Sequence, residues 1–113
     1  MKQISDVAVP AREAAGESGS VILDVRRRPV FEAATDQIPG SKWRDPAEAG
    51  QWLHELDPSI PTIVYCVHGH EVSQSVALTL NEAGISARYI QGGIEAWREA
   101  GLPLVNKTEG AVE

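Results

Sequence analysis

A single cysteine stands at the centre of the most reactive stretch of this chain. Cys66 is followed by His68, His70 and Glu71, so a thiol, two imidazoles and a carboxylate fall within six residues. The stretch follows a short apolar run, typical of a buried strand, and leads into an amphipathic segment that begins near Val72. A loop between a strand and a helix lies beside the positive end of the helix dipole. That position stabilises an anion and makes a thiolate a good nucleophile.

The backbone of this loop could itself hold an anion. A connection of six residues must curl, and Gly69 gives it conformational freedom, so its N–H groups can converge on one point. The predicted catalytic residue is Cys66. The predicted substrate-binding residues around it are Val67, His68, Gly69, His70, Glu71 and Val72. The alternative is that Cys66 is a small apolar residue that fills space at the end of a strand, and the spacing alone leaves both interpretations open.

The rest of the chain predicts the elements that hold this loop. Short β-branched runs alternate with segments of helical periodicity, which favours a parallel sheet with helices on both faces. In such a sheet, ligands bind beyond the carboxyl ends of the strands, which is where Cys66 falls. The predicted strands are 21–25, 42–43, 63–65 and 87–90, with an edge strand near Ile4, and the predicted helices are 29–34, 46–56, 72–83 and 94–100.

Length and composition predict one ordinary globular domain. The chain has 113 residues and a mass of 12.2 kDa, with 42% hydrophobic and 23% charged residues. We expect a single domain over 1–113, with its core at about 4–104 and a short tail at 105–113. Sixteen acidic and ten basic residues give a net charge of −6, which argues against a nucleic-acid or anionic-membrane partner. The basic triplet Arg26-Arg27-Arg28 is interpreted as a solvated turn.

The cysteine count and the hydropathy pattern predict a cytoplasmic protein. With Cys66 as its one cysteine, the chain can form no internal disulfide, so a disulfide-built secreted scaffold is excluded. No apolar stretch approaches the ~20 residues that span a bilayer. We therefore expect a chain that works in a reducing compartment without a membrane partner.

Four segments of the chain together resemble a known family. In order they are Leu23-Asp24-Val25-Arg26 with Phe31-Glu32, then Gln37-Ile38-Pro39-Gly40-Ser41, then Tyr65-Cys66-Val67-His68-Gly69, and finally Gln91 to Trp97 with Gly101-Leu102-Pro103. They resemble the "DVR", "HIPGA", "YCxxG" and "GGxxAW…GxP" segments of single-domain rhodaneses, which belong to the rhodanese/Cdc25 phosphatase superfamily. Each segment alone is weak, but four in the family's order are specific.

The resemblance implies a fold and an activity. The fold is a five-stranded parallel sheet with helices on both faces. The activity is sulfur transfer, in which Cys66 takes sulfane sulfur from a donor such as thiosulfate as a persulfide. It then passes the sulfur to cyanide or a thiol, and a protein could also be the acceptor. No metal and no organic cofactor is needed.

Two residues depart from the family's pattern. Gln37 stands where the turn usually has histidine, and Glu71 stands where many members carry arginine or another residue that tolerates anions. Because thiosulfate is a dianion, a carboxylate at the mouth of the site should weaken its binding. Protonated His68 and His70, together with Arg26 and Arg44 as further predicted substrate-binding residues, could offset that charge.

Three other functions compete with sulfur transfer. A cysteine phosphatase needs an arginine six positions after the nucleophile, where this chain has Val72, and no lysine or arginine occurs between Cys66 and Arg88. A thiolate and two imidazoles could instead bind zinc or copper. The third alternative is a non-catalytic rhodanese-like module that binds proteins or senses redox state or metals.

Several polar residues have a structural interpretation. We expect Asp24 and Arg26 to form a hydrogen-bonded pair near the carboxyl end of the sheet. Ser73 and Ser75 fall near the start of the predicted helix, so we interpret them as capping residues.

Overall fold

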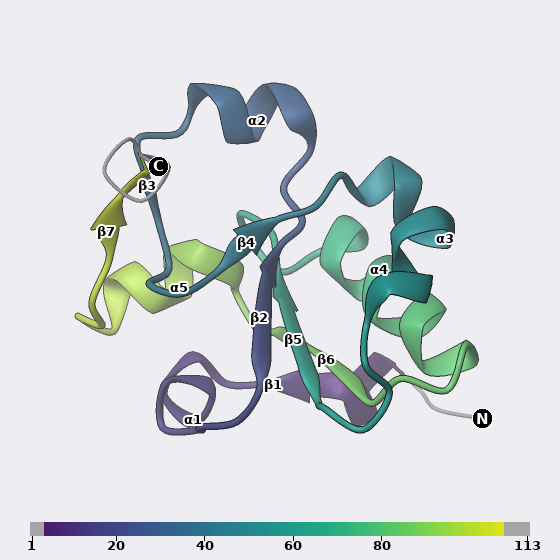
Figure 1. Cartoon of the computed structure of the whole chain (residues 1–113). Coiled ribbons are helices and arrows are strands. Elements are labelled where there is room, and N and C mark those ends of the chain that lie inside the picture. The colour runs from purple at the N-terminus through teal and green to yellow at the C-terminus, as the bar shows by residue number, and fades with distance from the viewer. Residues whose placement is uncertain (1–3, 108–113) are drawn as a thin grey trace.

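The computed structural model of the chain describes residues 4–107 and confirms the predicted α/β architecture (Figure 1). Five strands form one sheet in the order β1-β6-β5-β2-β4, and every neighbouring pair is parallel. The strands are β1 (Ala8–Val9), β2 (Val21–Asp24), β4 (Lys42–Trp43), β5 (Thr62–Tyr65) and β6 (Ala87–Ile90).

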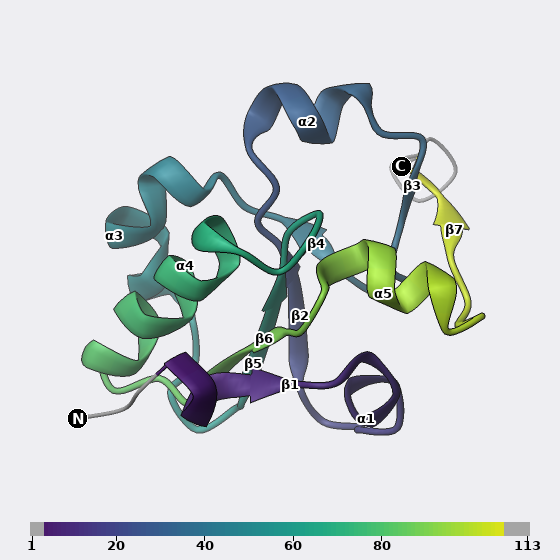
Figure 2. The same cartoon turned by 180° about the vertical axis from the view of Figure 1, so that it is seen from behind.

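Helices cover both faces of this sheet because the strand side chains alternate between them. Leu23, Val64 and Tyr89 belong to the core cluster on one face, whereas Ile63 and Ile90 belong to the cluster on the other. The first face packs against α3 (Ala49–Trp52) and α4 (Glu71–Glu82), and the second packs against α1 (Ala11–Ala15) and α5 (Gly93–Glu99). Figures 1 and 2 show these two helical layers on opposite sides of the sheet.

Short elements account for the differences from the sequence-based expectations. The segment near Ile4 is a 3₁₀ helix (Ile4–Val7), and the edge strand follows it as β1. The predicted helix over 46–56 consists of two 3₁₀ turns (Pro46–Glu48 and Leu53–Glu55) with α3 between them. Helix α1 was not predicted, because five residues are too few to show a helical period.

A second, two-stranded sheet joins distant parts of the chain. Strand β3 (Asp36–Gln37) pairs antiparallel with β7 (Val105–Asn106). The start of the predicted tail is therefore tied to the domain, and its residues 108–113 lie outside the described part of the chain. Within residues 4–107, no helix combines the length and the apolar composition that crossing a bilayer would require.

The register of the central strands brings two chemical segments to one edge. Asp24 at the end of β2 lies beside Tyr65 at the end of β5. Arg26 and Cys66, which follow these residues, therefore emerge at the same carboxyl edge of the sheet. Helix α2 (Arg28–Ala33) lies beyond this edge, on the side where the loop from β5 to α4 emerges (Figure 1).

Candidate functional site

Cys66 lies at the wall of a small cavity beyond the carboxyl end of β5. The loop runs from Cys66 to His70, and α4 begins at Glu71, one residue earlier than predicted. The Cys66 side chain is 7% exposed and borders a cavity of about 240 Å³. We call this space the Cys66 cavity. Its lining residues are Arg26, Arg27, Val30, Cys66, Val67, His68, His70, Glu71 and Val72.

The first turn of α5 fixes the orientation of the loop backbone. The carbonyl oxygens of Cys66 and Val67 accept hydrogen bonds from the backbone N–H groups of Ile94 (2.9 Å) and Glu95 (3.1 Å). The C=O and N–H groups of a trans peptide point in opposite directions, and residues 4–107 contain no cis peptide. The N–H groups of Val67 and His68 therefore point away from α5, none of whose residues lines the Cys66 cavity.

Two glycines allow the loop and α5 to approach this closely. Gly69 has a φ of +72°, and a Cβ atom there would lie 2.6 Å from the backbone nitrogen of Gly92 and 2.7 Å from the carbonyl oxygen of Ile90. Gly93 has a φ of +63°, and its Cβ would lie 2.4 Å from the Cys66 carbonyl oxygen. All three distances are shorter than a nonbonded contact allows, so only glycine fits at either position. Gly69 was predicted to bind substrate, but this part of the loop packs against the backbone of Ile90 and Gly92 and does not line the cavity.

A buried serine contacts the thiol directly. The Sγ–H of Cys66 donates a hydrogen bond to the Ser73 hydroxyl at 3.1 Å, and Ser73 is fully buried. The prediction that Ser73 caps the helix is therefore wrong: the N-cap residue is His70, which makes no side-chain capping bond. The signal that could have identified Ser73 is its place on the same helix face as the buried Val76 and Leu80. A hydroxyl on an apolar face needs a buried partner.

The predicted pair of Asp24 and Arg26 is present and buried. Asp24 is fully buried and Arg26 is 3% exposed, and the two side chains meet at 2.6 Å (Nη2–Oδ2) and 3.0 Å (Nε–Oδ1). Burial alone would lower the pKa of Arg26, but the hydrogen bonds and charge of Asp24 raise it. Arg26 borders the Cys66 cavity as predicted, but its positive charge is already matched by Asp24.

Arg44 and Arg27 lie in different surroundings. Arg44 does not line the Cys66 cavity, because its guanidinium pairs with Glu55 at 2.6 Å and stacks on Trp52. Arg27, which was interpreted as part of a solvated turn, is exposed to solvent but lines the cavity. It was missed because the triplet gives no indication of which arginine faces the site.

The two histidines lie on the cavity wall. The ring centroids of His68 and His70 are 6.0 Å apart, and the rings are tilted relative to each other. Among the residues that the structure describes, no three side chains of the His, Cys, Asp or Glu type are arranged to hold a metal ion. The geometry therefore gives no support to a zinc or copper site built from Cys66 and these histidines.

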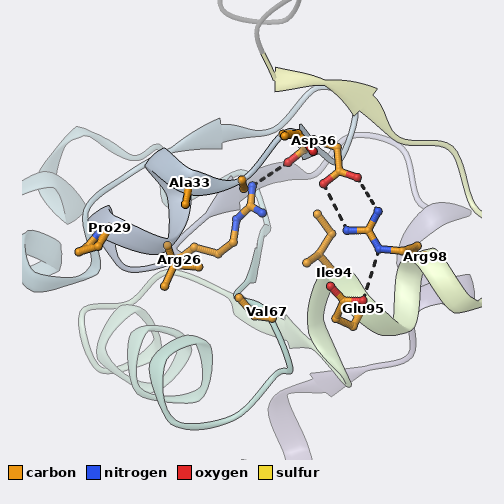
Figure 3. A pocket seen from close by; sticks show the side chains of 11 residues that line it. Arg26, Pro29, Ala33, Asp36, Val67, Ile94, Glu95 and Arg98 are labelled. Atoms are coloured by element: carbon orange, nitrogen blue, oxygen red, sulfur yellow. Dashed lines mark hydrogen bonds and ion pairs between the residues drawn. The ribbon is translucent and has the colours of Figure 1, made fainter.

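A larger cavity adjoins the Cys66 cavity between α2 and α5. It has a volume of about 680 Å³ and shares Arg26, Val30 and Val67 with the smaller space. Figure 3 shows these walls, with Arg98 placed between Asp36 and Glu95. The hydrogen bond from Arg98 is the main reason that the pKa of Asp36 is lowered. The larger cavity therefore offers space for the part of a ligand that does not contact the Cys66 thiol.

Comparison with known proteins identifies the family. The rhodanese-like domain family matches residues 9–100. The thiosulfate sulfurtransferase GlpE of Pseudomonas fluorescens (strain SBW25) is 32% identical over 99 residues, which cover 87% of this chain and 88% of that protein. Two solved structures are similar to this chain. The first, a rhodanese-related protein from Thermoplasma volcanium, has a TM-score of 0.77 at 26% identity, and the match covers 87% of this chain and 96% of that protein. The second, a full-length protein from Lactobacillus plantarum, has a TM-score of 0.80 at 25% identity, and the match covers 90% of this chain and 89% of that protein. Because the family match extends from β1 through the Cys66 loop to α5, this chain belongs to the rhodanese-like domain family.

Proposed function

We propose that this protein is a sulfurtransferase that carries sulfane sulfur on Cys66 as a persulfide. The donor is a small molecule such as thiosulfate, and the acceptor is cyanide or a thiol. The observation that carries the proposal is the position of Cys66, which borders a cavity beside the N-terminus of a twelve-residue helix and whose thiol donates a hydrogen bond to one buried hydroxyl. The name of the relatives as thiosulfate sulfurtransferases agrees with this chemistry.

The reaction proceeds through two displacements at sulfur. The Cys66 thiolate attacks the outer sulfur of thiosulfate, the S–S bond of the donor breaks, and sulfite leaves with the electron pair. An acceptor nucleophile then attacks the outer sulfur of the persulfide. The bond between the two sulfurs breaks, and its electron pair returns to Cys66. Neither step needs an external oxidant or reductant, because the sulfur is only passed on.

The groups around Cys66 can stabilise both anionic forms of the sulfur, the thiolate and the persulfide. The N–H groups of the loop and the N-terminus of α4 offer partial positive charge to a thiolate or a persulfide. The Ser73 hydroxyl can rotate and donate a hydrogen bond to the sulfur once it is ionised. A free thiol at the centre of the site also fits the reducing, cytoplasmic setting that the sequence predicts.

The test is sulfur loading measured by intact mass. We expect the protein to gain one sulfur atom after incubation with thiosulfate, and to lose it when cyanide is added with release of thiocyanate. Cys66→Ser, which is nearly isosteric, should fold normally and show neither reaction. Turnover above a few per cent of the wild-type rate in Cys66→Ser would show that another group carries the sulfur. Absence of loading by thiosulfate and by a persulfide donor would favour the non-catalytic module.

A further inference from the structure

We propose that Arg27 and Glu71 form a recognition site for a small thiol that carries both a carboxylate and an ammonium group. This thiol is the acceptor to which Cys66 passes its sulfur. The inference rests on the proposed sulfur transfer and adds the chemical class of the acceptor.

Arg27 and Glu71 occupy a shared rim. Both residues line the Cys66 cavity, and both also line a neighbouring cavity of about 500 Å³ that extends toward Ser75. One side chain comes from the segment after β2 and the other from the first turn of α4. The two side chains therefore come from different elements and border the same two cavities, one of which also borders Cys66.

Neither of these charges is satisfied by the protein itself. Each of the other arginines donates a side-chain hydrogen bond within the described chain, namely Arg12, Arg26, Arg28, Arg44, Arg88 and Arg98. Arg27 forms no side-chain hydrogen bond or ion pair with any residue in the range 4–107, and the same is true of the Glu71 carboxylate. Both side chains are exposed and remain available to a ligand.

A pair of opposite free charges favours a zwitterion. A dianion is attracted by Arg27 but repelled by Glu71, so the two side chains largely cancel in their effect on it. A molecule with a carboxylate and an ammonium group can place each charge beside its opposite. An amino-acid thiol of the size of cysteine combines these groups with a sulfur that can enter the Cys66 cavity.

The chemical step conserves atoms and electrons. The acceptor thiolate attacks the outer sulfur of the Cys66 persulfide, and a new S–S bond forms on the acceptor. The bond from the outer sulfur to Sγ breaks, and its electron pair stays on Cys66. The products are the Cys66 thiolate and the persulfide of the acceptor. Their total charge equals that of the reactants, the acceptor thiolate and the Cys66 persulfide.

Three thiols that differ only in their charged groups test the proposal. They are cysteine with both groups, mercaptopropionate with the carboxylate alone, and cysteamine with the ammonium alone. The full chain is first loaded from thiosulfate and its extra sulfur is confirmed by intact mass. Loss of that sulfur is then followed after each thiol is added. Rates are compared between variants for one thiol at a time, so the different acidities of the thiols do not enter.

The expected result is a crossed pattern. Arg27→Gln should slow transfer to cysteine and mercaptopropionate by about fivefold and leave cysteamine unchanged, as expected for one exposed charge contact. Glu71→Gln should slow transfer to cysteine and cysteamine by a similar factor and should not slow mercaptopropionate. Arg12→Gln is the matched control, because this exposed arginine donates a hydrogen bond to the Ala100 carbonyl oxygen and lines neither of the two cavities. It should leave all three rates within about twofold of wild type.

The outcomes separate the two proposals. If the loaded variants react with all three thiols at unchanged rates, or if each variant slows all three equally, Arg27 and Glu71 do not recognise the acceptor's charges. If wild-type Cys66 never gains sulfur from any donor, the proposed sulfur transfer itself fails. High salt should reduce the crossed pattern, because exposed charges are screened.

Discussion

Removing the Ser73 hydroxyl should slow the reactions of the Cys66 thiolate by about three- to tenfold at neutral pH. The hydroxyl lies 3.1 Å from Sγ and is fully buried, so water is poorly placed to replace it. A hydrogen bond to a charged group contributes about 1.5–3 kcal/mol. About half of that loss is recovered, because a less stabilised thiolate is a stronger nucleophile. The half that is not recovered lowers the rate at neutral pH and accounts for the expected three- to tenfold slowing.

The pH profile of alkylation distinguishes this role from a purely structural one. Ser73→Ala and wild type are treated with iodoacetamide over a range of pH, and loading from thiosulfate is measured in parallel. The deficit of Ser73→Ala should disappear at high pH, where the thiol is ionised in both proteins. Ser75→Ala is the matched control, because Ser75 is an exposed residue of the same helix that does not line the Cys66 cavity.

Two results would refute this reasoning. The first is an identical alkylation rate at every pH in a folded Ser73→Ala variant, which would mean that the hydroxyl does not stabilise the anion. The second is a rate lowered equally at every pH, which would indicate that the substitution only displaces the loop. Unfolding in urea should be measured for both serine variants, so that a change in stability is not mistaken for a change in reactivity.

Three further predictions concern the charges around the site and the fold. Glu71→Arg should raise kcat/KM for thiosulfate by about tenfold at low salt, and an unchanged or lower value in steady-state kinetics would show that Glu71 does not face the donor. Asp24→Asn should lower the free energy of unfolding by about 3–5 kcal/mol, because it leaves the buried Arg26 unpaired; urea titrations giving a loss below about 1 kcal/mol would contradict this. Hydrogen bonds from Arg88 lower the pKa of Glu17 from 4.5, so the stabilisation is present above that pH and is lost as the pH falls further. Arg88→Gln should therefore flatten the acid side of the stability curve measured by thermal unfolding.

The sequence predicted the central sheet well because its strands are continuous and apolar. Strands β2, β5 and β6 lie in the interior of the sheet and pack on both faces. Their sequences are therefore apolar runs, which predict strands from composition alone. The pairing of β3 with β7 was not predicted, since it joins two short segments that lie far apart in the chain and no local pattern marks them as partners. The helix over 46–56 was predicted as continuous because its apolar spacing is helical, whereas the observed 3₁₀ turns depend on local backbone geometry.

The site could be predicted where it is local and could not where it depends on tertiary contacts. The stretch from Cys66 to Val72 was located from its place between a strand and a helix, and all of it except Gly69 lines the cavity. Arg27 lies about forty positions earlier in the sequence, and Arg44 was chosen only because it is basic. The close approach of Gly93 to the loop has no local signal at all, because it depends on where α5 begins relative to Cys66.

The charges around Cys66 determine what can attract a substrate. Arg26 is neutralised by Asp24, and the remaining free charges, Arg27 and Glu71, are opposite in sign, so the lining carries no net charge from carboxylates and guanidinium groups. Attraction for an anionic sulfur must then come from the loop N–H groups and the N-terminus of α4, which act only over short distances. These dipoles favour any anionic sulfur at this position, whether it is a thiolate or a persulfide, so they do not select between donor or acceptor molecules. Under our proposal, recognition of that molecule falls to Arg27 and Glu71, which would distinguish ligands by the placement of their charges.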